Sequence, residues 1–190
     1  HRYGWVVEVD PSDPERKPAK RTALGRFRHE NAAVVVAPDG RVVVYMADDG
    51  RFEYIYKFVS KRKFIPGNQD HNWKILDDGQ LFVARFDEGF AGRWIELDQR
   101  HSKLVGEFDD QAEVLIFARR AADLVGASSC DRPEWITVDQ DPSTKKVRHA
   151  YASLTNNNKR GIPDLEGPNP ANPRVNNVYG HILRWRDADG

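Results

Sequence analysis

Asp-Gly pairs between runs of β-branched and aromatic residues constrain the fold of this chain more than any other feature. Residues 32–60 (AAVVVAPDGRVVVYMADDGRFEYIYKFVS) contain two such pairs, at 39–40 and 49–50. Glycine adopts the positive φ that tight turns between antiparallel strands require, so this segment is predicted to alternate strands with turns. Two later segments show the same pattern and predict a mainly β chain: residues 73–97, with turns at 78–79 and 89–92, and residues 134–155, with a turn at 141–143.

The spacing of these features indicates a repeated unit. Asp39 and Asp78 stand about 40 residues apart, close to the ~40–50 residue period of a propeller blade. YGWVVEVD at residues 3–10 and YGHILRWRD at residues 179–187 share an apolar alternation, and we interpret them as the same strand of two blades. The chain then ends in a predicted turn, residues 187–190, that would lead into another strand. Residues 1–190 are therefore interpreted as part of a single β-propeller domain that is truncated at both ends.

Two segments depart from the strand pattern. Residues 110–125 (DQAEVLIFARRAADLV) carry apolar side chains at a helical period, and they are predicted to form a helical insertion. Asp110 and Glu113 are arranged as an N-terminal capping box, and Gly126 suits the left-handed position after a helix. Residues 156–177 are rich in proline, asparagine and glycine and are predicted to form a long loop. Such loops are usually functional in compact domains, and disorder is the alternative.

Composition excludes several classes of function. Lysine plus arginine and aspartate plus glutamate number 29 each, so the net charge is zero and nucleic acid is a poor candidate partner. No apolar run reaches the roughly 18 residues of a membrane-spanning helix. The single cysteine, Cys130, excludes an internal disulfide framework and a multi-cysteine zinc site.

Acidic residues at predicted strand ends are the main candidates for chemistry. The sequence has no nucleophile elbow and no Gly-rich phosphate loop, and His29-Glu30 lacks the second histidine of a zinc-protease helix. Carboxylates that converge at the rim of a propeller channel repel one another unless a hard cation such as Ca²⁺ binds them. The alternative is that these acids only form turns. That alternative is favoured for Asp39 and Asp78, whereas Glu30 and Glu134 fit either interpretation.

The segment CDRPEWITVD, residues 130–139, places Asp131, Arg132 and Glu134 side by side where a predicted strand begins. One interpretation is a turn closed by a salt bridge. The other is a site where a carboxylate and a guanidinium face the same small anion or metal ion.

A series of motifs covers nearly the whole chain: YGWVVEVDP, LGRFRHE, VVVYMADDGRFEYIYKFVS, LFVARFD, DRPEWITVD, LTNNN and NPRVNNVYGHILRWR. In this order they resemble the PhoX family of alkaline phosphatases. The resemblance implies a six-bladed β-propeller, of which this chain would cover roughly three to four blades. It also implies a cluster of Ca²⁺ and Fe³⁺ ions at one end of the channel, hydrolysis of phosphomonoesters, and export to the periplasm or beyond.

The resemblance assigns roles to four residues. Glu30 of RHE, Asp49 of ADD in preference to Asp48, and Glu134 of RPEW look like metal ligands. Arg132 looks like a contact to the substrate phosphate, and Arg132 and Glu134 are the expected catalytic residues. An arginine fork can hold phosphate oxygens while a carboxylate holds the cation that polarises the same group.

Part of the family pattern is absent from these residues. The family's N-terminal cysteine and paired glutamates have no counterpart here, and Cys130 is not that cysteine. The expected function is a metal-dependent phosphomonoesterase in the parent protein, with the rest of the propeller as partner and little activity in the isolated chain. The alternative is a non-catalytic calcium-binding propeller that acts as a binding or scaffold domain, because propellers support many unrelated functions.

Overall fold

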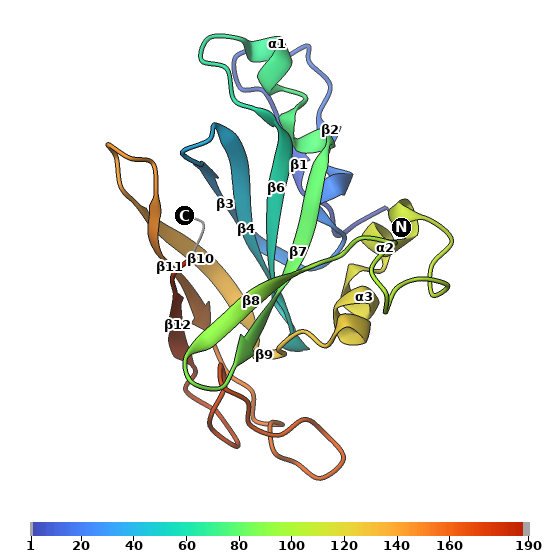
Figure 1. Cartoon of the computed structure of the whole chain (residues 1–190), viewed down its shortest axis with the longest axis vertical. Coiled ribbons are helices and arrows are strands. Elements are labelled where there is room, and N and C mark those ends of the chain that lie inside the picture. The colour runs from blue at the N-terminus through green and yellow to red at the C-terminus, as the bar shows by residue number, and fades with distance from the viewer. Residues whose placement is uncertain (1, 188–190) are drawn as a thin grey trace.

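The computed structural model describes residues 2–187, which are mainly β as expected (Figure 1). The largest sheet is antiparallel and has the strand order β3-β4-β6-β7-β8, and a second sheet has the order β10-β11-β12. Two short pairs, β1-β2 and β5-β9, complete the strands of the described residues. The strand bounds are β1 Val7–Glu8, β2 Ala19–Lys20, β3 His29–Val36, β4 Arg41–Asp48, β5 Arg51–Glu53, β6 Ile55–Lys63, β7 Gly79–Asp87, β8 Ala91–Glu96, β9 Cys130–Asp131, β10 Pro133–Gln140, β11 Val147–Leu154 and β12 His181–Trp185.

Several of the expected turns form hairpins, whereas Asp78-Gly79 follows a helical turn and β5, which follows Asp49-Gly50, pairs with β9 instead of β4. Gly40, with φ of +89°, closes the turn between β3 and β4 and donates its N–H to Ala37 O at 2.8 Å. Asp141 begins the turn between β10 and β11, where its Oδ1 accepts hydrogen bonds from the backbone N–H groups of Ser143 and Thr144. These turns bring neighbouring strands together in the antiparallel registers that both larger sheets use.

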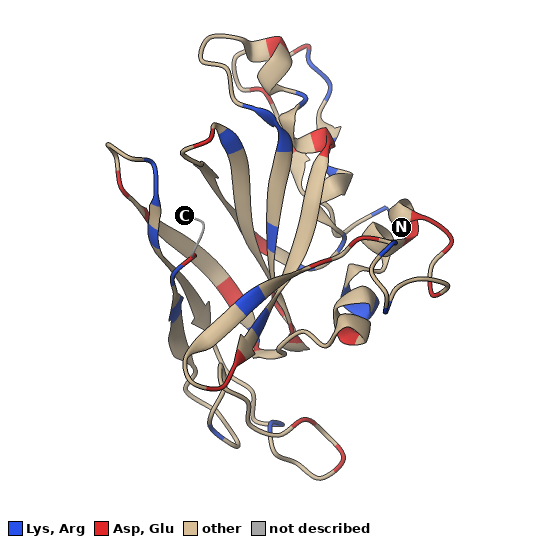
Figure 2. Cartoon of the chain, viewed as in Figure 1, with Lys and Arg blue, Asp and Glu red and all other residues tan. Residues whose placement is uncertain are grey.

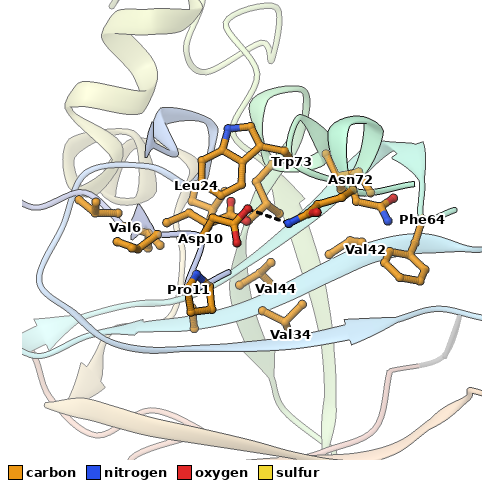
Figure 3. Close-up of a pocket in the computed structure, with 17 residues that line it drawn as sticks. Val6, Asp10, Pro11, Leu24, Val34, Val42, Val44, Phe64, Asn72 and Trp73 are labelled. Atoms are coloured by element: carbon orange, nitrogen blue, oxygen red, sulfur yellow. Dashed lines mark hydrogen bonds between the residues drawn. The ribbon is translucent and has the colours of Figure 1, made fainter. Parts of the chain in front are cut away.

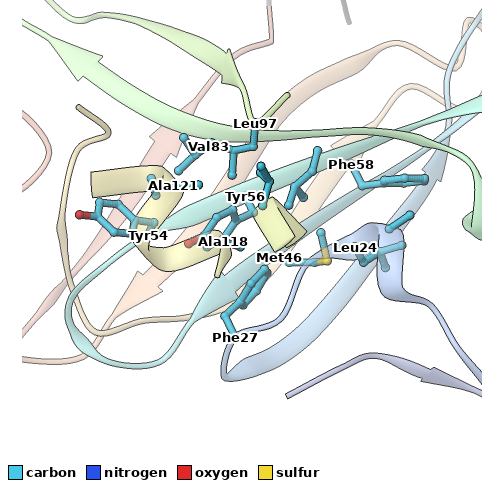
Figure 4. Close-up of a cluster of buried hydrophobic side chains, with 14 of the residues drawn as sticks. Leu24, Phe27, Met46, Tyr54, Tyr56, Phe58, Val83, Leu97, Ala118 and Ala121 are labelled. Atoms are coloured by element: carbon cyan, nitrogen blue, oxygen red, sulfur yellow. The ribbon is translucent and has the colours of Figure 1, made fainter. Parts of the chain in front are cut away.

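The strand β4 is buried on both of its faces because its side chains alternate between two apolar cores. Val44 and Met46 point into the first core, which Figure 4 shows between the large sheet and the helix that contains Ala118. Val43 and Tyr45 point into the second core, between the large sheet and β10–β12. The two larger sheets therefore pack together through the second core, and within residues 2–187 they do not close into a ring.

Residues 73–77 do not form the expected strand. They complete α1 (Gln69–Asn72) and form the 3-10 helix η2 (Ile75–Asp77), after which β7 begins directly at Gly79. This turn buries Ile75 in the first core and places the Asp77 carboxylate 2.6 Å from Nη1 of the buried Arg21. Asp39 lies in a hairpin and Asp78 follows a helical turn, so the spacing between them does not mark equivalent positions of a repeat.

The two YG segments are not equivalent strands either. Residues 181–185 form β12, whereas only Val7–Glu8 of the N-terminal segment is a strand, paired with the two residues of β2. Three prolines lie between these two short strands, at positions 11, 14 and 18, and proline cannot donate a ladder hydrogen bond. The turn expected at residues 187–190 falls largely outside the described residues.

The segment of residues 110–125 is helical, with a break at Phe117 between α2 (Gln111–Ile116) and α3 (Ala118–Val125). Asp110 caps α2 by accepting the Glu113 N–H at 2.8 Å, and Gly126 ends α3 in the left-handed conformation with φ of +78°. Residues 156–177 run without regular strands or helices, apart from isolated bridges, below the β9 end of the sheets in Figure 1. Across residues 2–187, no helix combines the length and apolar character needed to cross a bilayer.

Candidate functional site

Three of the four expected site residues meet in one cluster, although they come from distant parts of the chain. Asp49 lies in the turn between β4 and β5, Arg132 lies between β9 and β10, and Glu134 lies at the start of β10. Arg132 Nη2 donates to Asp49 Oδ2 at 3.0 Å and to Glu134 Oε1 at 3.1 Å, and its Nε lies 3.0 Å from Asp49 Oδ1. The hydrogen bond to Asp49 is the largest cause of the raised pKa of Arg132, so the guanidinium is cationic here.

Glu30 lies near this cluster but does not join its contacts. Its side chain is exposed at the start of β3 and forms no ion pair with the described residues. Its charge is close enough to contribute to the raised pKa of Arg132, after the contributions of Asp49 and Glu134. The cluster therefore consists of a directly bonded trio, Asp49–Arg132–Glu134, with Glu30 at its margin.

The backbone at Arg132 adopts a conformation that is unusual for an arginine. Its φ is +54°, in the left-handed region, which costs an L-residue about 1–2 kcal/mol. Hydrogen bonds on both sides hold it there, because Thr155 N–H donates to Arg132 O at 3.2 Å and Asp131 N–H donates to Asn172 Oδ1 at 2.9 Å. Strained backbone of this kind persists where the surrounding structure fixes a side chain in a required direction.

Glu30 and Glu134 both occupy β-bulges. In the β3–β4 ladder the register passes from His29↔Asp48 to Ala32↔Met46, so β3 holds one extra residue. The β10–β11 ladder shows the same insertion between Pro133 and Ile136. Bulges redirect side chains and are common beside active sites, so both glutamates lie where the regular alternation of a strand is broken.

Asp131 does not belong to the site, although it precedes Arg132 directly. Its side chain is fully buried and accepts hydrogen bonds from Arg160 Nε and from Asn177 Nδ2. Arg160 and Asn177 lie at either end of the loop of residues 156–177, so this buried ion pair anchors the loop to β9. No local pattern in the sequence indicates that Arg160 of that loop is buried.

Asp48 also faces the interior, while its neighbour Asp49 faces Arg132. The Asp48 side chain has no exposed surface and lies 3.0 Å from Arg119 Nε, on α3. Burial, followed by the charge of Glu53, raises the pKa of Asp48 to about 7. Arg119 also pairs with Glu53 and thereby ties the helical segment to the turn that carries Asp49. Sequence reasoning missed Arg119, because a helical arginine carries no signal of its partner.

The carboxylates of the trio have the chemistry of ligands for a hard cation. Asp49 Oδ1 is buried and, apart from its ion-pair contact with Arg132 Nε, accepts no hydrogen bond from the described residues. Glu134 Oε1 accepts hydrogen bonds from Arg132 and from Thr155 Oγ1, which leaves Oε2 without a hydrogen bond among residues 2–187. Such oxygens suit Ca²⁺. No group of three His, Cys, Asp or Glu side chains in the described part of the chain is arranged to hold a metal ion.

Two cavities of the structure lie away from the trio. One, of about 470 Å³, is lined mainly by apolar side chains beside α1 and is bordered by the Asp10–Gln69 hydrogen bond (Figure 3). The other, of about 1330 Å³, lies between the two larger sheets. Acidic and basic residues are scattered over much of the molecule, as Figure 2 shows, so charge alone does not single out the trio. The trio is distinguished instead by its converging charges, strained backbone and bulges.

Comparison with known proteins identifies the family. The family described as "Alkaline phosphatase PhoX" matches residues 1–190. The chain belongs to the PhoX family. Among solved structures, the Pseudomonas fluorescens PhoX in complex with vanadate, described as a transition-state analogue, is 53% identical and superposes with a TM-score of 0.90. That match covers 98% of this chain and 33% of the other, so these residues span about a third of that PhoX structure. A search among curated proteins finds no match.

Proposed function

We propose that these residues form part of a metal-dependent phosphomonoesterase that releases inorganic phosphate from phosphate monoesters. Membership of the PhoX family supports this function, and the observation that carries it is the position of Arg132 between two carboxylates. A cationic fork beside oxygen ligands for a hard cation is an arrangement that can bind and polarise a phosphoryl group. The PhoX structure with bound vanadate supports the same chemistry for the relative.

Arg132 would bind the phosphate of the substrate. Its Nη2 and Nε face Asp49 and Glu134, while its Nη1 donates no hydrogen bond to any of residues 2–187. The side chain is 29% exposed, so solvent and ligands can reach it. Hydrogen bonds between a guanidinium and an anion contribute about 1.5–3 kcal/mol each. Arg132 would therefore orient the phosphoryl group and neutralise part of its charge.

Asp49, Glu134 and Glu30 would contribute ligands to the metal ions, for which Ca²⁺ and Fe³⁺ are the proposed identities. When bound, these ions supply Lewis-acid polarisation of the phosphoryl oxygens. Thr155 would hold Glu134 in place through its hydrogen bond to Oε1 at 3.0 Å. The bulge at each glutamate would turn its carboxylate away from the regular sheet surface.

We further propose that the two stacked sheets are neighbouring blades of a six-bladed propeller, completed by the rest of the polypeptide. Metal ligands that residues 2–187 do not provide would come from that remainder. We also propose that the protein works in the periplasm or outside the cell. The alternative function, a non-catalytic calcium-binding scaffold, differs from the proposal in one respect that an assay can measure, which is turnover.

Hydrolysis of an aryl phosphate by the full-length protein tests the proposal. Turnover should be lost in the presence of a calcium chelator and should return when Ca²⁺ is added in excess. Calcium binding without any turnover, for a protein that also contains bound iron, would favour the scaffold function. Turnover that no chelator affects would contradict the role of the metal.

A further inference from the structure

Asn31 joins the two larger sheets at the site. Its Nδ2 donates a hydrogen bond to Ile136 O at 2.7 Å, and its Oδ1 accepts one from Ile136 N–H at 3.0 Å. One side-chain amide thus satisfies both backbone groups of a residue that is only 1% exposed. Since β3 and β10 are edge strands of different sheets, no ladder holds them together at this point.

The position of this link relates it to the two glutamates. Asn31 follows Glu30 within the bulge of β3, and Ile136 is the residue at which β10 resumes its register after the bulge that contains Glu134. At the other ends of the same strands, Gln140 Nε2 donates to Val36 O at 2.8 Å. The two strands are therefore linked by side-chain hydrogen bonds at two places, and Asn31 makes the link nearer the site.

We propose that Asn31 is a positioning residue that sets the separation of Glu30 and Glu134. This inference rests on the proposed function, in which both glutamates bind metal ions. A bulge lacks the regular hydrogen bonds of a ladder, so the backbone at each glutamate is less constrained than in the rest of its strand. The two hydrogen bonds of Asn31 supply that constraint across the sheets. Loss of the Asn31 amide should weaken metal binding without removing any ligand.

The chain contains a matched control for this residue. Asn72, at the end of α1, makes the same pair of hydrogen bonds to one backbone residue: Nδ2 donates to Ile65 O at 2.8 Å, and Oδ1 accepts Ile65 N–H at 3.0 Å. Asn72 contributes to the wall of the cavity beside α1 and contacts none of the proposed site residues. The same substitution at the two positions removes the same bonds, and only one of them lies beside the site.

The test compares Asn31→Ala with Asn72→Ala in the full-length protein. Three quantities are measured: calcium affinity by titration with CaCl₂, kcat and KM for an aryl phosphate at saturating calcium, and hydrogen exchange of the backbone amides. Residues that orient metal ligands without binding the metal themselves typically contribute about 10–100-fold to metal affinity or activity. Asn31→Ala should therefore lower calcium affinity or kcat by at least about tenfold and speed exchange at Ile136. KM should change less than kcat, because Arg132 keeps its contacts, and Asn72→Ala should match the unmodified protein.

Asn31→Leu and Asn72→Leu repeat the comparison with side-chain volume retained, in case the alanine variant does not fold. Calcium affinity and kcat that remain equal in the Asn31 and Asn72 variants, with faster exchange at Ile136 in the former, would overturn the positioning role. Glu134→Gln separates this failure from failure of the proposed function. If Glu134→Gln loses metal while the Asn31 variants do not, only the positioning role is wrong. If Glu134→Gln keeps its metal and its activity, both inferences are wrong.

Discussion

Two arginine–carboxylate clusters contain the adjacent residues Asp131 and Arg132, and they differ in solvent exposure and in hydrogen bonding. Asp131 pairs with Arg160, and both side chains are 0% exposed. Arg132 pairs with Asp49 and Glu134, with side chains that are 29%, 20% and 25% exposed. We call the first the closed pair and the second the open trio. Asp131 and Arg132 are consecutive residues of the DRPE motif. The first lies in the interior, and the second lies in a solvent-accessible cluster.

The two clusters differ most in how completely their hydrogen bonds are satisfied. Every guanidinium nitrogen of Arg160 has an acceptor: Nε bonds Asp131, Nη1 bonds Gly167 O, and Nη2 bonds Ser129. In the open trio, Arg132 Nη1 and Glu134 Oε2 have no hydrogen bond to residues 2–187. A buried ion pair must be fully bonded to offset its desolvation, whereas a site for ligands must keep some bonding capacity free. The difference separates a structural cluster from one that can bind.

The largest effect expected from changing either cluster is the loss of activity in Glu134→Ala. Removal of a carboxylate that binds the metal should lower activity more than removal of a residue that only orients such a ligand. Activity should therefore fall by at least about a hundredfold. The bound metal content, measured by elemental analysis of the purified full-length protein, should fall with it. Unchanged metal content together with unchanged turnover of an aryl phosphate would show that the open trio is not the metal site.

Substitution in the closed pair should instead reduce stability. Asp131→Asn leaves Arg160 charged and buried without its counter-ion, a change that typically costs about 3–5 kcal/mol of unfolding free energy. Urea unfolding followed by tryptophan fluorescence measures this cost. Asp139→Asn is a control, because Asp139 pairs with Arg148 on the exposed surface, where an ion pair is worth about 0–1 kcal/mol. Equal losses in the two variants would show that burial does not distinguish the closed pair.

Arg132→Ala should weaken binding of phosphate and leave stability nearly unchanged. The variant loses hydrogen bonds to the anion, each worth about 1.5–3 kcal/mol, so inhibition by inorganic phosphate should weaken by about ten- to a hundredfold. Bound metal should remain, since no carboxylate is removed. Arg120→Ala, on α3, removes an exposed pair with Glu107 and serves as the control. Loss of metal in Arg132→Ala would mean that the arginine holds the site together rather than the substrate.

A smaller effect should separate Arg132→Gly from Arg132→Ala. Glycine adopts positive φ without a Cβ penalty, so the glycine variant should be more stable than the alanine variant by about 1 kcal/mol. Thermal unfolding of the two variants side by side measures this difference. An alanine variant that is equally stable or more stable would indicate that the left-handed backbone at residue 132 is not strained.

The smallest effect concerns Cys130, which precedes the closed pair. Burial raises the pKa of this thiol to about 12, and the side chain is 0% exposed. The thiol is therefore protonated and inaccessible at neutral pH, and a thiol-specific reagent should not modify it in the folded protein. Modification should appear only when urea unfolds the chain. Rapid modification of the folded protein would show that the β5–β9 region opens readily.

Several features of the fold could be predicted because they depend on local backbone geometry. Gly40 and Gly126 adopt the positive φ that their turn and helix end require, and Asp110 caps the helix that follows it. The expected strand at residues 73–77 was wrong because a tertiary contact decided it. In the helical turn, Ile75 packs into the first core and Asp77 accepts a hydrogen bond from the buried Arg21. An alternation of apolar and polar residues over five positions does not contain that information.

The proposed site could be predicted only in part from the sequence, because tertiary contacts decide the roles of several of its residues. Family motifs pointed to Arg132, Glu134 and Asp49, and in the structure Arg132 contacts both carboxylates. They did not distinguish the interior role of Asp131, because its partner Arg160 lies in a loop with no helical or strand period. They also gave no role to Asn31, whose partner Ile136 belongs to another sheet.

The sequence by itself determined the mainly β character of the chain, its principal turns, its helical segment and its family. These follow from φ preferences, side-chain periodicity and motifs, which act over a few residues. Only the tertiary structure decided which of two adjacent residues faces the interior and which faces the site. That choice depends on desolvation and on the full set of hydrogen-bond partners. For Asp131 and Arg132 those partners lie in loops and strands up to 83 residues away in the sequence.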